Sequence, residues 1–256
     1  MSAPRAREAL TDLAAAFKLP TIAAELVQRL EQAGHDAALP VLLEVFEQER
    51  DDRRERRVER LRRASKLPPG KTFDSFDDKR LSVKLSRQLR ELARGDFLDQ
   101  AVNVLAFGLP GTGKTHSACA LGHALVEAGR SVLFIPTYKL VQNLLIAKRD
   151  LELSKALRRL DNYELLILDD IGYVKQDADQ IEVLFTLMAE RYERRSILIT
   201  SNLVFSQWDR IFRDPMTTAA AIDRLVHHSA ILEFDVESYR AQKPERTKKP
   251  DQKQTS

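Results

Sequence analysis

A cluster of glycines followed by a lysine and a threonine is the most informative stretch of this chain. Residues 103–115 read NVLAFGLPGTGKT and match the spacing G-x-x-x-x-G-K-[ST] from Gly108 to Thr115. Glycines let backbone N–H groups turn inward around phosphate oxygens, and a helix that begins here adds its positive partial charge. The pattern therefore predicts a phosphate-binding loop.

The side chains of this loop suit a nucleotide that is bound with a magnesium ion. Lys114 can reach the β- and γ-phosphates, and the Thr115 hydroxyl can ligate Mg²⁺. An apolar run precedes the loop and a helical stretch follows it, as the pattern requires. The residues expected to bind the nucleotide are Gly108, Leu109, Pro110, Gly111, Thr112, Gly113, Lys114, Thr115 and His116.

Two further apolar runs end in polar residues that could complete an active site. ELLILDDIG supplies Asp169, which can hold Mg²⁺ together with Thr115, and Asp170, which can orient and polarise an attacking water. SILITSN carries Asn202 toward the γ-phosphate. The ordinary alternatives are a helix cap or surface charge for the aspartates and a turn for the asparagine.

Alternating strands and helices must bring these residues together. Apolar runs occur at residues 102–107, 131–135, 164–169, 196–201 and 230–234, with helical stretches between them. Five buried strands joined by helices indicate an α/β fold with a parallel sheet that is covered on both faces.

Composition divides the rest of the chain. Residues 1–66 carry apolar side chains at helical spacing and predict a small all-helical domain. Residues 67–76 contain two prolines and a glycine and predict a linker to an α/β domain at residues 77–241. Residues 242–256 read as a disordered basic tail.

Charge and apolar content limit the class of protein. Hydrophobic residues make up 43% and charged residues 31%, with a net charge of +3. No apolar run is long enough to span a bilayer, and the N-terminus lacks the apolar core of a signal peptide. We expect a cytoplasmic protein with no membrane partner. The single cysteine, Cys119, excludes an intramolecular disulfide and a four-cysteine metal site.

Together these motifs resemble those of the IstB-like transposition helper ATPases. GLPGTGKTH, LLILDDIGY, RYERRSILITSNL, FSQWDRIFRD, AAAIDRLVHHS and ESYR occur here in the family's order, and the resemblance runs from about Leu19 to Arg240. This family is a branch of the AAA+ superfamily, beside DnaC-like helicase loaders and DnaA-like replication initiators. The resemblance implies a P-loop three-layer sandwich that uses ATP and Mg²⁺.

The resemblance also implies an active site shared between subunits. Arg224 matches the arginine finger that AAA+ proteins supply to a neighbouring subunit, where it stabilises charge on the transferring phosphoryl group. Asp170 stands where AAA+ enzymes usually carry glutamate, so we expect slow turnover. Because few residues follow the last strand, we expect no C-terminal lid domain of the usual kind. Arg240 is the candidate for the lid's sensor arginine.

A basic helical segment lies between the second and third apolar runs. Residues 139–159 contain six basic and two acidic residues. In initiator-type AAA+ proteins an extra helical element at this point lines the assembly and contacts DNA, whereas the ordinary alternative is a solvated helix pair. The candidate DNA-binding residues are Lys139, Lys148, Arg149, Lys155, Arg158 and Arg159. A second candidate is the arginine-rich helix at residues 49–66, where nine basic residues meet five acidic ones.

The function implied by the resemblance is an ATP-dependent regulator of transposition. It would assemble as a homo-oligomer or helical filament on duplex DNA and recruit a transposase, and hydrolysis would drive disassembly. One alternative is a DnaC-like loader whose residues 1–66 grip a replicative helicase. Another is a nucleotide-gated DNA scaffold that never hydrolyses ATP, against which the intact Asp169, Asp170, Asn202 and Arg224 argue.

Overall fold

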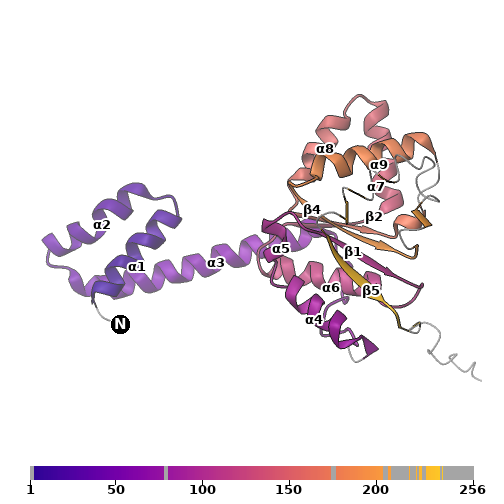
Figure 1. The fold of residues 1–256 in the computed structure, drawn as a ribbon. Coiled ribbons are helices and arrows are strands. Elements are labelled where there is room, and N and C mark those ends of the chain that lie inside the picture. Colours follow the sequence, from indigo (N-terminus) through magenta and orange to yellow (C-terminus); the bar gives the residue numbers. More distant parts are fainter. Residues whose placement is uncertain are drawn as a thin grey trace, which may run out of the picture. The chain divides into compact units, whose positions relative to one another are not determined.

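The computed structural model describes residues 3–77, 80–173, 177–203, 207–208, 219, 223, 225–226, 229–236 and 238. The chain divides into two compact units, Met1–Arg60 and Leu61–Ser256, and each is described by itself. Figure 1 shows that the first unit is helical and that the second contains the sheet. None of the described helices combines the length and apolarity that crossing a bilayer requires.

Three helices and one helical turn form the first unit. These are α1 (Ala3–Ala16), α2 (Pro20–Gln32), the 3₁₀ turn η1 (Asp36–Ala38) and α3 (Leu39–Ser65), which extends into the second unit. Pro20 occupies the first turn of α2, where its missing N–H costs nothing. The Phe17 and Phe46 rings stack with centroids 5.7 Å apart, and the Arg53 guanidinium covers Phe17 at 4.2 Å. The arginine-rich helix thus supplies part of this unit's packing.

The second unit is built on five parallel strands in the order β2-β3-β4-β1-β5. The prediction of a five-stranded parallel sheet is confirmed, and each predicted run contains the strand to within a residue or two. The strands are β1 (Asn103–Gly108), β2 (Val132–Pro136), β3 (Leu165–Asp169), β4 (Ser196–Ser201) and β5 (Ser229–Phe234).

Helices cover both faces of the sheet, as Figure 1 shows. One layer contains α4 (Val83–Leu92), the short α5 (Asp96–Asp99) and α6 (Lys114–Glu127). The other contains α7 (Thr137–Arg149), α8 (Leu153–Asp161) and α9 (Ala178–Arg191). Successive residues of each strand point to opposite faces, so Val104 packs toward the first layer and Leu105 toward the second. The result is the three-layer sandwich expected from the sequence.

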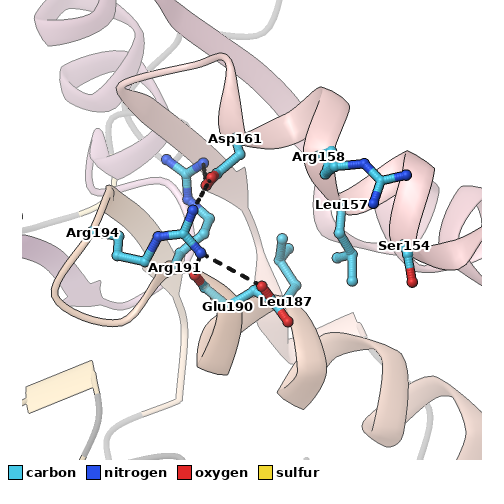
Figure 2. A pocket seen from close by; sticks show the side chains of 8 residues that line it. All are labelled: Ser154, Leu157, Arg158, Asp161, Leu187, Glu190, Arg191 and Arg194. Atoms are coloured by element: carbon cyan, nitrogen blue, oxygen red, sulfur yellow. Dashed lines mark hydrogen bonds and ion pairs between the residues drawn. The ribbon is translucent and has the colours of Figure 1, made fainter.

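One buried arginine ties the amino-terminal edge of the sheet to its helices. Arg191 is 2% exposed and donates hydrogen bonds to the carbonyl oxygens of Leu160 (3.0 Å), Tyr163 (2.9 Å) and Ser196 (3.0 Å). Burial lowers the pKa of Arg191 to about 10, so the guanidinium stays charged at neutral pH. Figure 2 shows it beside Asp161, among the residues that line a cavity of about 260 Å³ between α8 and α9.

Candidate nucleotide-binding site

The glycine-rich loop connects β1 to α6 and takes a shape that side chains would prevent. Gly108 has φ 152°, and a Cβ at this position would lie 2.5 Å from the Phe234 carbonyl oxygen on β5. Gly113 has φ 98° immediately before α6 begins. Both positions need glycine, since left-handed backbone and close strand approach exclude a side chain. The loop therefore presents its backbone at the amino-terminal end of α6.

Side chains of the loop brace it from within. Thr112 is fully buried and donates to the Leu109 carbonyl oxygen at 2.9 Å. The Lys114 ammonium donates to the carbonyl oxygens of Gly108 (2.6 Å) and Leu109 (2.8 Å). Phosphate oxygens are stronger, charged acceptors than these neutral carbonyls. Lys114 is thus held over the loop and can exchange these contacts for a bound phosphate.

The threonine that follows Lys114 reaches across to the end of β3. Thr115 donates its hydroxyl hydrogen to Asp169 Oδ1 at 2.8 Å. Because that hydrogen is committed to the carboxylate, the lone pairs of Thr115 Oγ1 stay available to a cation. Mg²⁺ prefers such hard oxygen ligands and commonly uses one carboxylate together with substrate phosphates and waters. The donor set of Thr115 and Asp169 therefore fits Mg²⁺.

Asp170 lies in an environment that disfavours its own charge. Burial raises its pKa, and the neighbouring Asp169 carboxylate raises it further. Its Oδ1 is buried and accepts no hydrogen bond from any described residue. Its backbone has φ 58°, in the left-handed region that aspartate tolerates better than most residues. A buried acceptor without a partner is a group that can orient a water molecule.

Asn202 follows β4 and lies beside Asp170. A Cβ added to Gly172 would collide with Asn202 Oδ1 and would lie 3.6 Å from Asp170 Oδ1. The two side chains therefore face the same small space above Gly172. The structure thus brings Thr115, Asp169, Asp170 and Asn202 together at the carboxyl edge of β3 and β4, next to the glycine-rich loop.

A cleft of about 320 Å³ adjoins the loop, and part of its wall comes from the expected linker. The glycine-rich loop and the start of α6 line part of the cleft. The rest of its lining includes Lys71, Ser75, Phe76 and Asp77. The His116 ring holds this segment to α6, with Nε2 lying 3.1 Å from both the Thr72 carbonyl oxygen and Ser75 Oγ. Residues 67–77 are packed structure that could contact a bound nucleotide.

The sequence prediction missed these cleft residues. The two prolines and the glycine at positions 68–70 suggested a break, and the two phenylalanines of FDSFD were the only signal that the segment packs. The Phe76 ring lies 5.0 Å from the His116 ring, and His123 Nε2 lies 3.1 Å from the Pro68 carbonyl oxygen. Such contacts join residues some forty positions or more apart, which local patterns do not reveal.

The six basic candidates for DNA contact differ in what surrounds them. Lys148 lies 2.8 Å from carboxylate oxygens of both Asp179 and Glu182, so its ammonium joins α7 to α9. Lys139, Arg158 and Arg159 are exposed. Together with Lys155, the positive charge of Arg159 is near enough to the Glu152 carboxylate to lower the pKa of that carboxylate.

Arg149 and Lys155 form exposed pairs with Asp150 at 2.9 Å and Glu152 at 2.8 Å. Such exposed pairs are weak and can open. Two other predicted residues, Arg224 and Arg240, lie outside the described residues.

Comparison with known proteins identifies the family. Residues 12–247 match the family model described as IstB-like ATP binding protein. The chain belongs to this family. It is 47% identical to an insertion-sequence ATP-binding protein of Sinorhizobium fredii, over 88% of this chain and 76% of that protein. It is 39% identical to the insertion sequence IS21 ATP-binding protein of Pseudomonas aeruginosa, over 76% and 74% of the two chains.

Solved structures agree on the fold. The DnaC helicase loader matches with a TM-score of 0.56 at 20% identity, over 65% of this chain and 97% of the loader. The replication initiator DnaA, solved with AMPPCP and single-stranded DNA, matches with a TM-score of 0.54 at 16% identity, over 68% and 52% of the two chains. These matches show that this chain has the P-loop α/β fold of the two proteins, and its family is that of an ATP-binding protein.

Proposed function

We propose that this IstB-like protein is an ATP-controlled regulator of transposition that assembles on duplex DNA and recruits a transposase. The observation that carries the proposal is the meeting of Thr115, Asp169, Asp170 and Asn202 beside the glycine-rich loop. The names of the relatives support it, because they are ATP-binding proteins of insertion sequences. ATP binding favours assembly, and hydrolysis ends it.

The catalytic cycle begins when the loop receives the triphosphate. Backbone N–H groups of the loop and the Lys114 ammonium bind phosphate oxygens, and Lys114 leaves the carbonyls of Gly108 and Leu109. Thr115 and Asp169 would hold Mg²⁺, which neutralises phosphate charge when bound. Asp170 orients and polarises the attacking water. Asn202, which faces the same space above Gly172, contacts the γ-phosphate.

Assembly makes hydrolysis depend on a neighbouring subunit. Arg224 supplies positive charge to the neighbour's γ-phosphate, where charge accumulates as the phosphoryl group transfers. A subunit alone binds ATP but lacks the neighbour's arginine. Within the assembly, turnover stays slow because Asp170 stands in place of the usual glutamate, so the ATP-bound form persists on DNA long enough to meet a transposase. The copurifying partner is an independent check, because a replicative helicase in place of the transposase would favour the loader alternative.

The DNA contacts of the α7–α8 pair are the first part of this proposal that mutation can test. Changing both Arg158 and Arg159 to Ala is expected to weaken duplex binding about tenfold and to lower the slope of log affinity against log salt by about two. Both guanidiniums are exposed on α8, where phosphates can reach them. Fluorescence anisotropy at several salt concentrations measures both quantities.

A control with the same loss of charge comes from α4 and the residues after it. Arg87 and Arg94 are exposed, and neither belongs to the α7–α8 pair. Changing both to Ala should leave the salt slope unchanged. Equal effects of the two double variants, or no effect of the α8 variant, would contradict DNA contact through α8.

A further inference from the structure

Two buried threonine hydroxyls hold the Asp169–Asp170 peptide from opposite sides. Thr200 on β4 donates to Asp169 Oδ1 at 2.8 Å and accepts the Asp170 backbone N–H at 2.8 Å. Thr137, the first residue of α7, donates to the Asp169 carbonyl oxygen at 3.0 Å. Both threonines are essentially inaccessible to solvent, with 1% and 0% exposure.

The sheet explains why the hydroxyls come from these two places. β3 lies between β2 and β4, and its last backbone-paired position opposite β4 is Leu168 with Ile199. One residue further along β4, the Thr200 side chain, and not a backbone carbonyl, accepts the next hydrogen bond from the β3 chain. Asp170 lies beyond the last paired position of β3 and has a left-handed backbone, with φ 58°. The Thr200 oxygen satisfies the Asp170 N–H.

We propose that Thr200 and Thr137 are positioning residues of the ATPase, which aim Asp169 at the metal and Asp170 at the attacking water. They act through the two aspartates, and the inference rests on the roles proposed for those aspartates above. Thr200 is the more consequential of the two because it contacts both residues, whereas Thr137 contacts the Asp169 backbone alone.

The chemistry requires a hydroxyl at position 200. Its single hydrogen goes to the Asp169 carboxylate, and its lone pairs receive the Asp170 N–H. Valine matches threonine in shape but can neither donate nor accept, while serine can do both. Asp169 Oδ1 also receives the Thr115 hydroxyl, so two donors fix the carboxylate in one orientation.

Enzyme kinetics of Thr200→Val, Thr200→Ser and Thr137→Val test the proposal. For Thr200→Val we expect kcat to fall about 10- to 100-fold, because Asp170 loses its orientation for water. The dissociation constant for a fluorescent ATP analogue should stay within about twofold, because the phosphate loop is untouched. Thr200→Ser should recover most of the lost turnover, and Thr137→Val should lose less than Thr200→Val. Thr186→Val is a matched control, since this partly exposed threonine of α9 donates its hydroxyl hydrogen to the Glu182 carbonyl oxygen of its own helix.

Two results with Thr200→Val would overturn the inference, and the other variants decide if that protein does not fold. The first is wild-type kcat in Thr200→Val. The second is a loss of nucleotide affinity as large as the loss of turnover, which would indicate a general structural role. If Thr200→Val does not fold, Thr200→Ser with low kcat or Thr137→Val with unchanged kcat would count against it. A result in which Asp170→Asn loses turnover but Thr200→Val does not would leave the ATPase proposal intact and remove only the positioning role.

Discussion

Changing Asp170 to Asn should lower ATP turnover about 100-fold or more while making the nucleotide-free protein more stable. The loss of turnover is expected because asparagine cannot accept a proton from, or polarise, the attacking water as a carboxylate does. The gain in stability is expected because the folded protein disfavours the charge at this position. Burial and the Asp169 carboxylate both raise the pKa of Asp170.

The pH dependence of the stability difference follows from the direction of that shift. A carboxyl group with a raised pKa in the folded state stabilises the fold below its ordinary pKa and loses that contribution as pH rises through the folded value. At neutral pH the wild type therefore holds an unfavourable charge that Asp170→Asn removes. The advantage of the variant should shrink as pH falls toward the ordinary pKa of aspartate.

Thermal melts of both proteins with EDTA and without nucleotide, between about pH 4 and pH 8, measure this difference. Steady-state turnover with ATP and Mg²⁺ measures the loss of activity. A variant that is less stable at pH 8, or whose advantage grows on acidification, would show that the environment of Asp170 favours its charge. Wild-type turnover in the variant would remove Asp170 from the catalytic role.

Among the variants proposed for this protein, Arg191→Leu should lower the free energy of unfolding the most, by about 3–5 kcal/mol. The guanidinium joins the end of α8 to the starts of β3 and β4 through carbonyls of Leu160, Tyr163, Glu164 and Ser196. Leucine fills a similar volume but donates no hydrogen bond to these oxygens, of which those of Leu160 and Glu164 also accept a backbone N–H. Lysine should rescue little, since one ammonium cannot reproduce the geometry of the planar fork.

Arg194 is the matched control for Arg191. It lines the same cavity and donates to Asp161 Oδ2 at 2.6 Å, but its side chain is 59% exposed. Its replacement by Leu should cost less than about 1 kcal/mol, as for other exposed pairs. Urea denaturation of the two variants compares these costs. Similar losses at both positions would contradict the special role assigned to the buried guanidinium.

The parts of this protein that sequence could predict are those set by local pattern. Spacing of glycines and lysine located the loop, and apolar runs located five strands and hence the edge where Asp169 and Asn202 meet. The helical layers followed because parallel strands require crossover connections. In the loop and at the end of β3, the same short stretch of sequence contains the functional residues and the element that positions them.

Features that depend on distant partners could not be predicted in the same way. Lys148 was predicted only as a DNA contact, and its ion pairs with Asp179 and Glu182 depend on the packing of α9 against α7. Arg191 reads as one of several charges at a helix end, and only the packing of α8 and two strands around it makes it buried. Thr200 gains its two hydrogen bonds from the register between β3 and β4.

The central claim is that the nucleotide in the phosphate loop controls assembly on DNA. The most direct test is the size of the protein on a duplex of about fifty base pairs, a length that accommodates several subunits, with ATP, with ADP and for Lys114→Ala with ATP. Light scattering or analytical ultracentrifugation gives the size. We predict large complexes only for the wild type with ATP, because only that sample combines the intact lysine with a γ-phosphate. Complexes of equal size in all three samples would contradict the claim.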